Sequence, residues 1–168
     1  MTTIFRQIHD PNDPVCADIA ALWTHYIDTS VVTFNPKPKT RDAISEAIRE
    51  KRIAGDPVFA AYRDDTFIGF GTYGPFRTGE GYKFSKEHTI MLDAASTGSG
   101  IGRQLIHRLE EHACTNNVQS LWAGVTGTNQ AAIDFHKTMG FQHIVTIPEI
   151  GWKFDRWHDL VLMRKRLR

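Results

Sequence analysis

The stretch EHTIMLDAASTGSGIGRQL, residues 87–105, decides the fold of this chain. Residues 87–92 are predicted to form a strand because β-branched and apolar residues dominate them. A glycine-rich turn follows and opens an amphipathic helix. Gly98, Gly100 and Gly102 permit positive φ and leave the backbone bare, so their amide hydrogens can surround an anion. The positive end of the helix points to the same place, and the sequence therefore predicts a phosphate-binding turn.

Two better-known phosphate motifs do not fit this turn. The dinucleotide-binding pattern needs a further glycine at position 103, where Arg103 stands. A P-loop needs a longer glycine spacing that ends in Lys and Ser or Thr, and this is also missing. Glycines alone leave a plain flexible turn as the alternative.

The size and charge of the chain limit its class. With 168 residues and 41% hydrophobic content, the chain predicts a single domain over residues 1–168. A formal net charge of +1 gives no reason to expect nucleic acid or a membrane as a partner. Cys16 and Cys114 are far apart and predict neither a metal site nor a disulfide. We see no leader sequence and no long apolar run, so we expect a cytoplasmic protein.

Hydrophobic periodicity predicts the order β-α-α-β-β-β-α-β-α-β-β. Helices are expected after Pro14 and after Thr40, and over 102–116 and 130–139. Strands are expected over 3–8, 58–62, 66–73, 87–92, 120–125, 141–147 and 160–163, with 74–86 and 151–159 irregular. Too few crossover helices are present for a doubly wound sheet. The prediction is an α+β fold with a mixed, mostly antiparallel, twisted sheet and helices on both faces.

A second motif lies at residues 129–141, NQAAIDFHKTMGF. Together with the Gly100-Ile101-Gly102 turn, it resembles the GCN5-related N-acetyltransferase (GNAT) family, whose motifs read Q/R-x-x-G-x-G/A and, downstream, A-x-x-F-Y-x-K-x-G-F. Two positions depart from the family pattern: Thr97 stands at the Gln/Arg position and His136 at the Tyr position. Residues 151–159, GWKFDRWHD, resemble the phosphinothricin and methionine sulfoximine acetyltransferase group.

The resemblance implies acetyl-CoA as co-substrate, no metal, and a homodimer. The residues it implies for cofactor binding are Ile90, Met91, Leu92, Gly98, Ser99, Gly100, Ile101, Gly102, Arg103, Asn129 and His136. A bulged strand near Met91 and Leu92 is expected to offer free amides to the oxyanion of the reaction. Asn129 is also a helix cap, which alone would explain that residue.

Acyl transfer to an amine needs a base, because amines are mostly protonated near neutral pH. Glu87, at the start of the central strand, is the predicted base; the alternative is a solvated glutamate. His136 is the predicted acid for the leaving thiolate, or only a contact of the pantetheine chain. Cys114 lies late on a helix, so we expect direct transfer rather than an acyl-cysteine route.

An amino-acid-like substrate carries a carboxylate, which a guanidinium pairs well. Arg77 is the predicted partner, with a plain surface arginine as the alternative. Phe34, Tyr82 and Trp152 are candidate walls of the substrate pocket, or else core or interface aromatics. The predicted function is acetyl transfer to a small amino-acid-like amine of the phosphinothricin or methionine sulfoximine type. A non-catalytic acyl-CoA sensor and a protein N-terminal acetyltransferase remain the alternatives.

Overall fold

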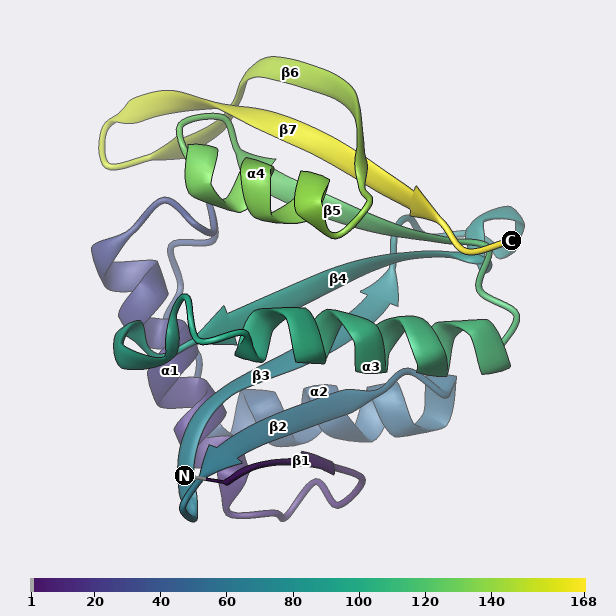
Figure 1. The fold of residues 1–168 in the computed structure, drawn as a ribbon. Helices are drawn as coiled ribbons and strands as arrows, with labels where there is room; N and C mark the ends of the chain where they lie inside the picture. Colours follow the sequence, from purple (N-terminus) through teal and green to yellow (C-terminus); the bar gives the residue numbers. More distant parts are fainter. Residues whose placement is uncertain (1) are drawn as a thin grey trace.

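The computed structural model describes residues 2–168, which form one seven-stranded sheet with helices on both faces (Figure 1). The strands are β1 (Thr3–Gln7), β2 (Val58–Arg63), β3 (Thr66–Pro75), β4 (Ser85–Leu92), β5 (Ser120–Thr126), β6 (Gln142–Lys153) and β7 (Arg156–Arg166). The helices are α1 (Val15–Thr29), α2 (Arg41–Ala54), α3 (Ile101–Thr115) and α4 (Gln130–Thr138), with short 3₁₀ turns at Glu80–Tyr82 and Ala94–Ser96. The predicted element order is confirmed.

The strands lie in the order β1-β2-β3-β4-β5-β7-β6, and all neighbours are antiparallel except β4 and β5. The predicted mixed, mostly antiparallel sheet is therefore confirmed. The one parallel pair lies in the middle of the sheet. A crossover through α3 connects its two strands, as parallel neighbours require.

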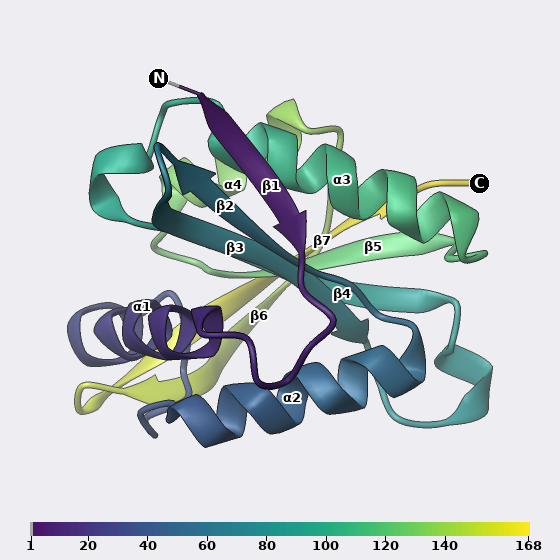
Figure 2. The same ribbon diagram turned by 90° about the horizontal axis from the view of Figure 1, so that it is seen from below.

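The two faces of the sheet have separate apolar layers. Figure 2 shows α1 and α2 on one side of the sheet and α3 and α4 on the other. Met91 of β4 is buried with Ile19 and Ile48 under α1 and α2. Ile90, the preceding residue, packs against Ile106 under α3. Adjacent residues of β4 thus face opposite layers, as the alternation of a strand requires.

The sequence predicts Thr40 as the cap that begins α2 and Gly140 as the cap that ends α4, and the structure confirms the first. Thr40 Oγ1 accepts a hydrogen bond from Ala43 N at 3.1 Å at the start of α2, and Gly55 ends that helix with φ 72°. At the end of α4 the cap is Met139, and Gly140, with φ 88°, is the residue after it rather than the cap itself. The left-handed residue of a helix end commonly occupies that following position.

Of the two segments expected to be irregular, 151–159 belongs largely to strands, and 74–86 does so only at its two ends. Residues 151–159 form the tip of the β6–β7 hairpin, with Phe154 and Asp155 at φ 50° and 57° in its turn. Positive φ at both central residues matches the right-handed twist of the flanking strands. Residues 74–86 are irregular only in part, because β3 extends to Pro75 and β4 begins at Ser85.

A close backbone neighbour leaves no room for a side chain at Gly69. Its φ is 153°, and a Cβ atom built there would lie 2.5 Å from Met91 O. Of the four described helices, none has the length and apolar character needed to cross a membrane.

Candidate active site

The strands β4 and β5 pair only at their beginnings. Their register joins Ser85 to Ser120, Lys86 to Leu121 and Glu87 to Trp122, and then stops. Beyond this point β4 continues to Leu92 against β3, and β5 continues to Thr126 against β7. The two ribbons run together at one end and diverge toward the other (Figure 1). In the centre of the sheet, the edges of β4 and β5 therefore face each other without forming hydrogen bonds between the two strands.

Free backbone amides face this opening, but the reason differs from the predicted one. The pairing of β4 with β3 continues without a bulge from Pro75–Lys86 to Gly69–Leu92. Asp93 N donates to Ile68 O at 2.9 Å, so by alternation Met91 turns its N–H toward β3. Ile90 and Leu92 turn theirs toward the open edge. The divergence of β4 and β5, rather than a bulge in β4, frees these amides.

Glu87 lies at the last paired position before the strands separate. Its side chain lies against β5, where a Cβ atom built on Gly124 would be 2.8 Å from Glu87 Oε1. Burial raises the pKa of the Glu87 carboxyl above its ordinary value. A carboxylate with a raised pKa at an opening in the sheet has the character of a general base.

His88 follows Glu87 and therefore points to the opposite face of β4, toward α4. Its ring lies 5.1 Å from that of His136, measured between centroids, and Nε2 of His88 is 3.0 Å from Nε2 of His136. His136 also contacts the ring of Phe141, and it is held by Ala132 O, 2.7 Å from its Nδ1. Burial lowers the pKa of His136. The predicted acid thus lies on one face of β4 and the predicted base on the other.

Two of the three glycines of the turn have the positive φ expected of them, and Gly102 lies within α3 instead. Gly98 and Gly100 have φ 77° and 84°, and both are exposed. Gly100 is the N-cap of α3 and offers no side-chain oxygen, so the first amides of the helix have no side-chain partner. These amides and the helix dipole provide the donors that a phosphate group prefers.

The other residues of the turn have different roles. Ile101 is buried under the sheet, so its side chain serves the core and only its amide is available. A Cβ atom on Gly102 would lie 3.4 Å from the Phe135 ring, so this glycine lets α3 and α4 approach each other. Arg103 is exposed at the first turn of α3, and Ser99 Oγ donates to Ser96 O.

Arg63, at the end of β2, is a residue of this site that the sequence did not indicate. Its NH2 group donates to Ser99 Oγ at 3.3 Å, although 36 positions separate the two residues. Thr97, at the position where the family pattern has Gln or Arg, donates instead to Asp93 O at 3.3 Å. Arg63 pairs with Thr66 at the end of the β2–β3 hairpin, and its side chain reaches the glycine turn from there. A cation from β2 therefore stands beside Ser99, in addition to Arg103 of the turn itself.

Asn129 caps α4, with its side-chain oxygen accepting from Ala132 N at 3.1 Å. The predicted cap is confirmed, and a contact with pantetheine stays a prediction. Arg77 and Tyr82 lie in the exposed loop between β3 and β4, where the Arg77 guanidinium stands 5.4 Å from the centre of the Tyr82 ring. Among residues 2–168, no hydrogen bond or ion pair joins either of them to Glu87, and their substrate role stays a prediction.

Phe34 is fixed by the β6–β7 hairpin. Its ring stacks on His158 at 5.8 Å, and a Cβ atom on Gly151 would lie 2.3 Å from Phe34 Cδ2. Lys153 donates to Ser30 O at 2.7 Å and to Thr33 O at 2.8 Å. These contacts attach the loop between α1 and α2 to the hairpin. The sequence suggests Trp152 of this segment as a pocket wall or an interface residue. It gives no sign that the segment holds the loop between α1 and α2.

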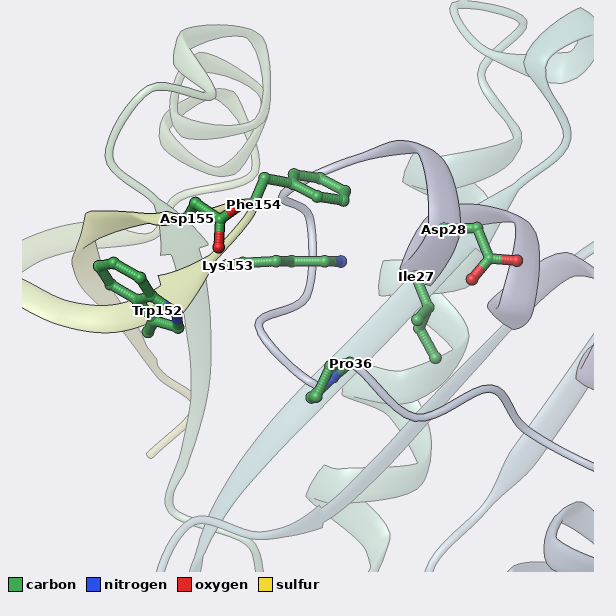
Figure 3. A pocket seen from close by; sticks show the side chains of 7 residues that line it. All are labelled: Ile27, Asp28, Pro36, Trp152, Lys153, Phe154 and Asp155. Atoms are coloured by element: carbon green, nitrogen blue, oxygen red, sulfur yellow. The ribbon is translucent and has the colours of Figure 1, made fainter.

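A shallow hollow of about 370 Å³ lies beside this anchor, lined by Ile27, Asp28, Pro36, Trp152, Lys153, Phe154 and Asp155. Figure 3 shows the Lys153 side chain extending between Phe154 and the end of α1. Glu87 and His136 are not among its lining residues. The hollow is therefore part of the loop anchor and is separate from the two predicted catalytic residues. Across residues 2–168, no group of three or more His, Cys, Asp or Glu side chains is arranged to hold a metal ion.

Similarity to known proteins agrees with this geometry. The sequence is 28% identical over 152 residues to the L-methionine sulfoximine/L-methionine sulfone acetyltransferase of Salmonella typhimurium, covering 90% of this chain and 89% of that one. It is 27% identical over 163 residues to the phosphinothricin N-acetyltransferase of Alcaligenes faecalis, covering 96% and 81%. A structure of yncA from Salmonella typhimurium with its cofactor acetyl-CoA has a TM-score of 0.93 and 26% identity, covering 99% and 94%.

The family itself is shown by a match to a family model over most of the chain. The sequence model described as "Acetyltransferase (GNAT) family" matches residues 19–141, which include both motifs and the divergence of β4 and β5. Both resemblances predicted from the sequence, to the family and to its phosphinothricin and methionine sulfoximine group, are confirmed. The chain belongs to the acetyltransferase (GNAT) family and is an acetyltransferase.

Proposed function

We propose that this acetyltransferase transfers the acetyl group of acetyl-CoA directly to the amine of a small amino-acid-like substrate of the phosphinothricin or methionine sulfoximine type. One observation carries the proposal. Glu87 and His88 are adjacent on β4 and face opposite layers, and His88 contacts His136 at 3.0 Å. A base and an acid thus flank the point where β4 and β5 separate. The curated relatives that act on such amines support the substrate class.

Acetyl-CoA fits the residues present around the glycine turn. The exposed amides of residues 98–103 suit its diphosphate, and Arg63 adds a charged donor beside Ser99. The open-edge amides of Ile90 and Leu92 can extend the contact along β4 toward Glu87. A thioester laid along this edge has its carbonyl oxygen within reach of backbone donors.

In this arrangement Glu87 takes the proton of the acceptor amine, directly or through water. The amine nitrogen bonds to the acetyl carbon, and the oxyanion is stabilised by amides of β4. The carbon–sulfur bond then breaks, and the departing thiolate receives a proton from His136. The nitrogen releases its second proton to solvent as the amide forms. The base and the acid are also reset through solvent, so the products are an amide, free coenzyme A thiol and one proton.

A covalent cysteine route does not fit the positions of the thiols. Cys16 is buried in the first turn of α1, and Cys114 is at the C-terminal end of α3. The glycine turn is at the other end of that helix, about 20 Å away for 15 residues at 1.5 Å each. We therefore infer direct transfer with both substrates bound.

The proposal is tested by measuring release of coenzyme A thiol with a panel of acceptors. The panel contains phosphinothricin, methionine sulfoximine, ordinary amino acids and a peptide with a free N-terminus. We expect acceptor-dependent release with the first two and its loss in Glu87→Gln. Binding of acetyl-CoA without release for any acceptor would instead indicate a sensor, and release with the peptide alone would indicate an N-terminal acetyltransferase.

We further infer that the protein acts as a homodimer in the cytoplasm. The β6–β7 hairpin supports the dimer, because it exposes large apolar side chains: Ile150, Trp152, Phe154 and Trp157 are all more than half exposed. Sedimentation equilibrium checks the mass, and a monomer at all concentrations would exclude the dimer. Trp157→Glu, at the hairpin tip, is expected to weaken it.

A further inference from the structure

Both imidazoles of the site are held at Nδ1 by a group that can only accept a hydrogen bond. His88 Nδ1 is 2.9 Å from Trp122 O, and His136 Nδ1 is 2.7 Å from Ala132 O. A carbonyl oxygen has no hydrogen to give, so each Nδ1 carries the proton. A neutral imidazole has one N–H and one bare nitrogen. With Nδ1 protonated, the bare nitrogen of each ring is Nε2.

These two nitrogens nevertheless lie 3.0 Å apart, which is hydrogen-bonding distance. Two bare nitrogens would place their lone pairs against each other. One proton between them turns this repulsion into an N–H···N hydrogen bond. From this geometry we propose that His88 and His136 bind one proton as a unit, with His88 as the positioning residue that keeps His136 protonated at Nε2.

The surroundings allow one charge on the pair but not two. Burial lowers the pKa of His88 and a charge on His136 lowers it further, to about 3, so His88 is the ring that stays neutral. Phe141 contacts both rings and Phe135 contacts His136. A neutral His88 with its lone pair directed at His136 is the acceptor that an imidazolium at position 136 requires.

Other titratable groups around the pair have their own partners. Lys86, two residues before His88 and on the same face of β4, is 2.7 Å from Asp56. Tyr73, opposite His88 on β3, has its hydroxyl 2.6 Å from His112 Nδ1 on α3. Glu87 faces the other layer of the sheet. None of these groups forms a hydrogen bond or ion pair with either ring among residues 2–168.

The shared proton is inferred from the geometry alone, and only its use in catalysis rests on the proposed function. In acetyl transfer the proton on His136 Nε2 leaves its hydrogen bond with His88 and passes to the sulfur as the carbon–sulfur bond breaks. Both rings are then neutral until solvent returns a proton. A histidine at this position thus acts as an acid together with His88, rather than alone.

The protonation of the free enzyme is measured by long-range ¹H–¹⁵N NMR of the histidine side chains. The scan covers about pH 3 to 8, because burial lowers the pKa of both rings below the ordinary imidazole value of about 6.5. We expect Nδ1–H on both rings and uptake of a single proton shared by the two Nε2 nitrogens. A neutral ring carrying Nε2–H with bare Nδ1 would overturn the proposal. So would two bare Nε2 nitrogens across the whole range. No acetyl acceptor is needed, so this result is independent of the proposed function.

The pH profile of the transfer reaction gives the second readout. His88→Leu removes the acceptor at similar volume, and His88→Gln restores an oxygen that can accept. We expect the alkaline decline of kcat to move to lower pH in His88→Leu and to return toward the wild-type position in His88→Gln. A purely structural role would lower kcat equally at all pH values, and an unchanged profile in His88→Leu would overturn the proposal. If no acceptor is acetylated at all, the proposed function fails while the NMR result still decides the pair.

Discussion

The carboxylate of Glu87 on β4 lies against Gly124 on β5, so close that a Cβ atom at residue 124 would be 2.8 Å from Glu87 Oε1. We predict that Gly124→Ala displaces the carboxylate and lowers kcat by about tenfold to a hundredfold, because a shift of about 1 Å in a catalytic group costs this much. Steady-state kinetics measure the effect. In a Glu87→Ala background the same substitution should cost almost nothing more. Equal losses in both backgrounds would show that Gly124 acts on something other than Glu87.

Glu87 itself sets the acid side of the pH profile. Burial raises its pKa, so the carboxylate is lost as pH falls through a value above the ordinary one for glutamate. We expect kcat/KM to decline on acidification in the wild type. Glu87→Gln should lower kcat by about 10²- to 10⁴-fold, the usual contribution of a general base, and abolish that decline. A Glu87→Gln enzyme with wild-type kcat would exclude the residue as base.

Arg63 provides a test of the phosphate site. Its guanidinium donates to Ser99 Oγ beside the glycine turn. Loss of a charge-assisted contact costs about 1.5–3 kcal/mol, so Arg63→Ala should raise the KM for acetyl-CoA by about tenfold or more and leave the acceptor KM unchanged. Arg52→Ala, at an exposed position in the last turn of α2, is the matched control. Equal acetyl-CoA affinity in both variants would remove Arg63 from the site.

Lys153 controls the loop between α1 and α2. The side chain is buried and its ammonium bonds Ser30 O and Thr33 O. Lys153→Met leaves two carbonyls without that donor, and we expect a loss of about 1–3 kcal/mol in the free energy of unfolding. Amide exchange over residues 30–40 should quicken and the acceptor KM should rise, because Phe34 lies in this loop. The exposed Lys37→Met is the control, and equal exchange rates in the two variants would contradict the anchor.

His88 links stability to pH. In the unfolded chain an imidazole binds a proton below about pH 6.5, whereas buried His88 binds one only at about pH 3. Between these values the unfolded state binds more protons, so the free energy of unfolding should fall as pH falls. Urea unfolding at several pH values measures this slope. The comparison is made in a His136→Gln background, so that loss of His88 does not also change the protonation of His136. There His88→Leu should make the slope shallower by up to one proton, and identical slopes would show that His88 does not stay neutral in the folded state.

Much of this fold follows from local sequence signals. Periodicity and the caps at Thr40 and Asn129 predict the helices and their order, and the glycine turn predicts the start of α3. The tip of the β6–β7 hairpin was not predicted, because Phe154 and Asp155 adopt a left-handed backbone conformation and this pair of residues is not a usual signal for such a turn. Only the paired register of the folded hairpin shows that this segment is regular.

Site residues could be predicted from the sequence only where a single residue lies within a recognisable local motif. Glu87 and His136 could be indicated because each lies within a local motif. Arg63 reaches Ser99 across 36 positions, and Lys153 reaches Ser30 across 123, so no local pattern relates these pairs. His88 was visible in the sequence beside Glu87, yet its meaning depends on Nε2 of His136 lying 3.0 Å away. Such relations exist only once the sheet and α4 have formed.

The most direct test of the proposed function is a crystal structure of the Glu87→Gln variant with acetyl-CoA and methionine sulfoximine. We predict that the diphosphate lies on the amides of residues 98–103, with Arg63 beside it. The thioester should lie between the diverging halves of β4 and β5, and the acceptor amine within hydrogen-bonding distance of residue 87. An empty glycine turn, or an amine bound away from residue 87, would contradict the account.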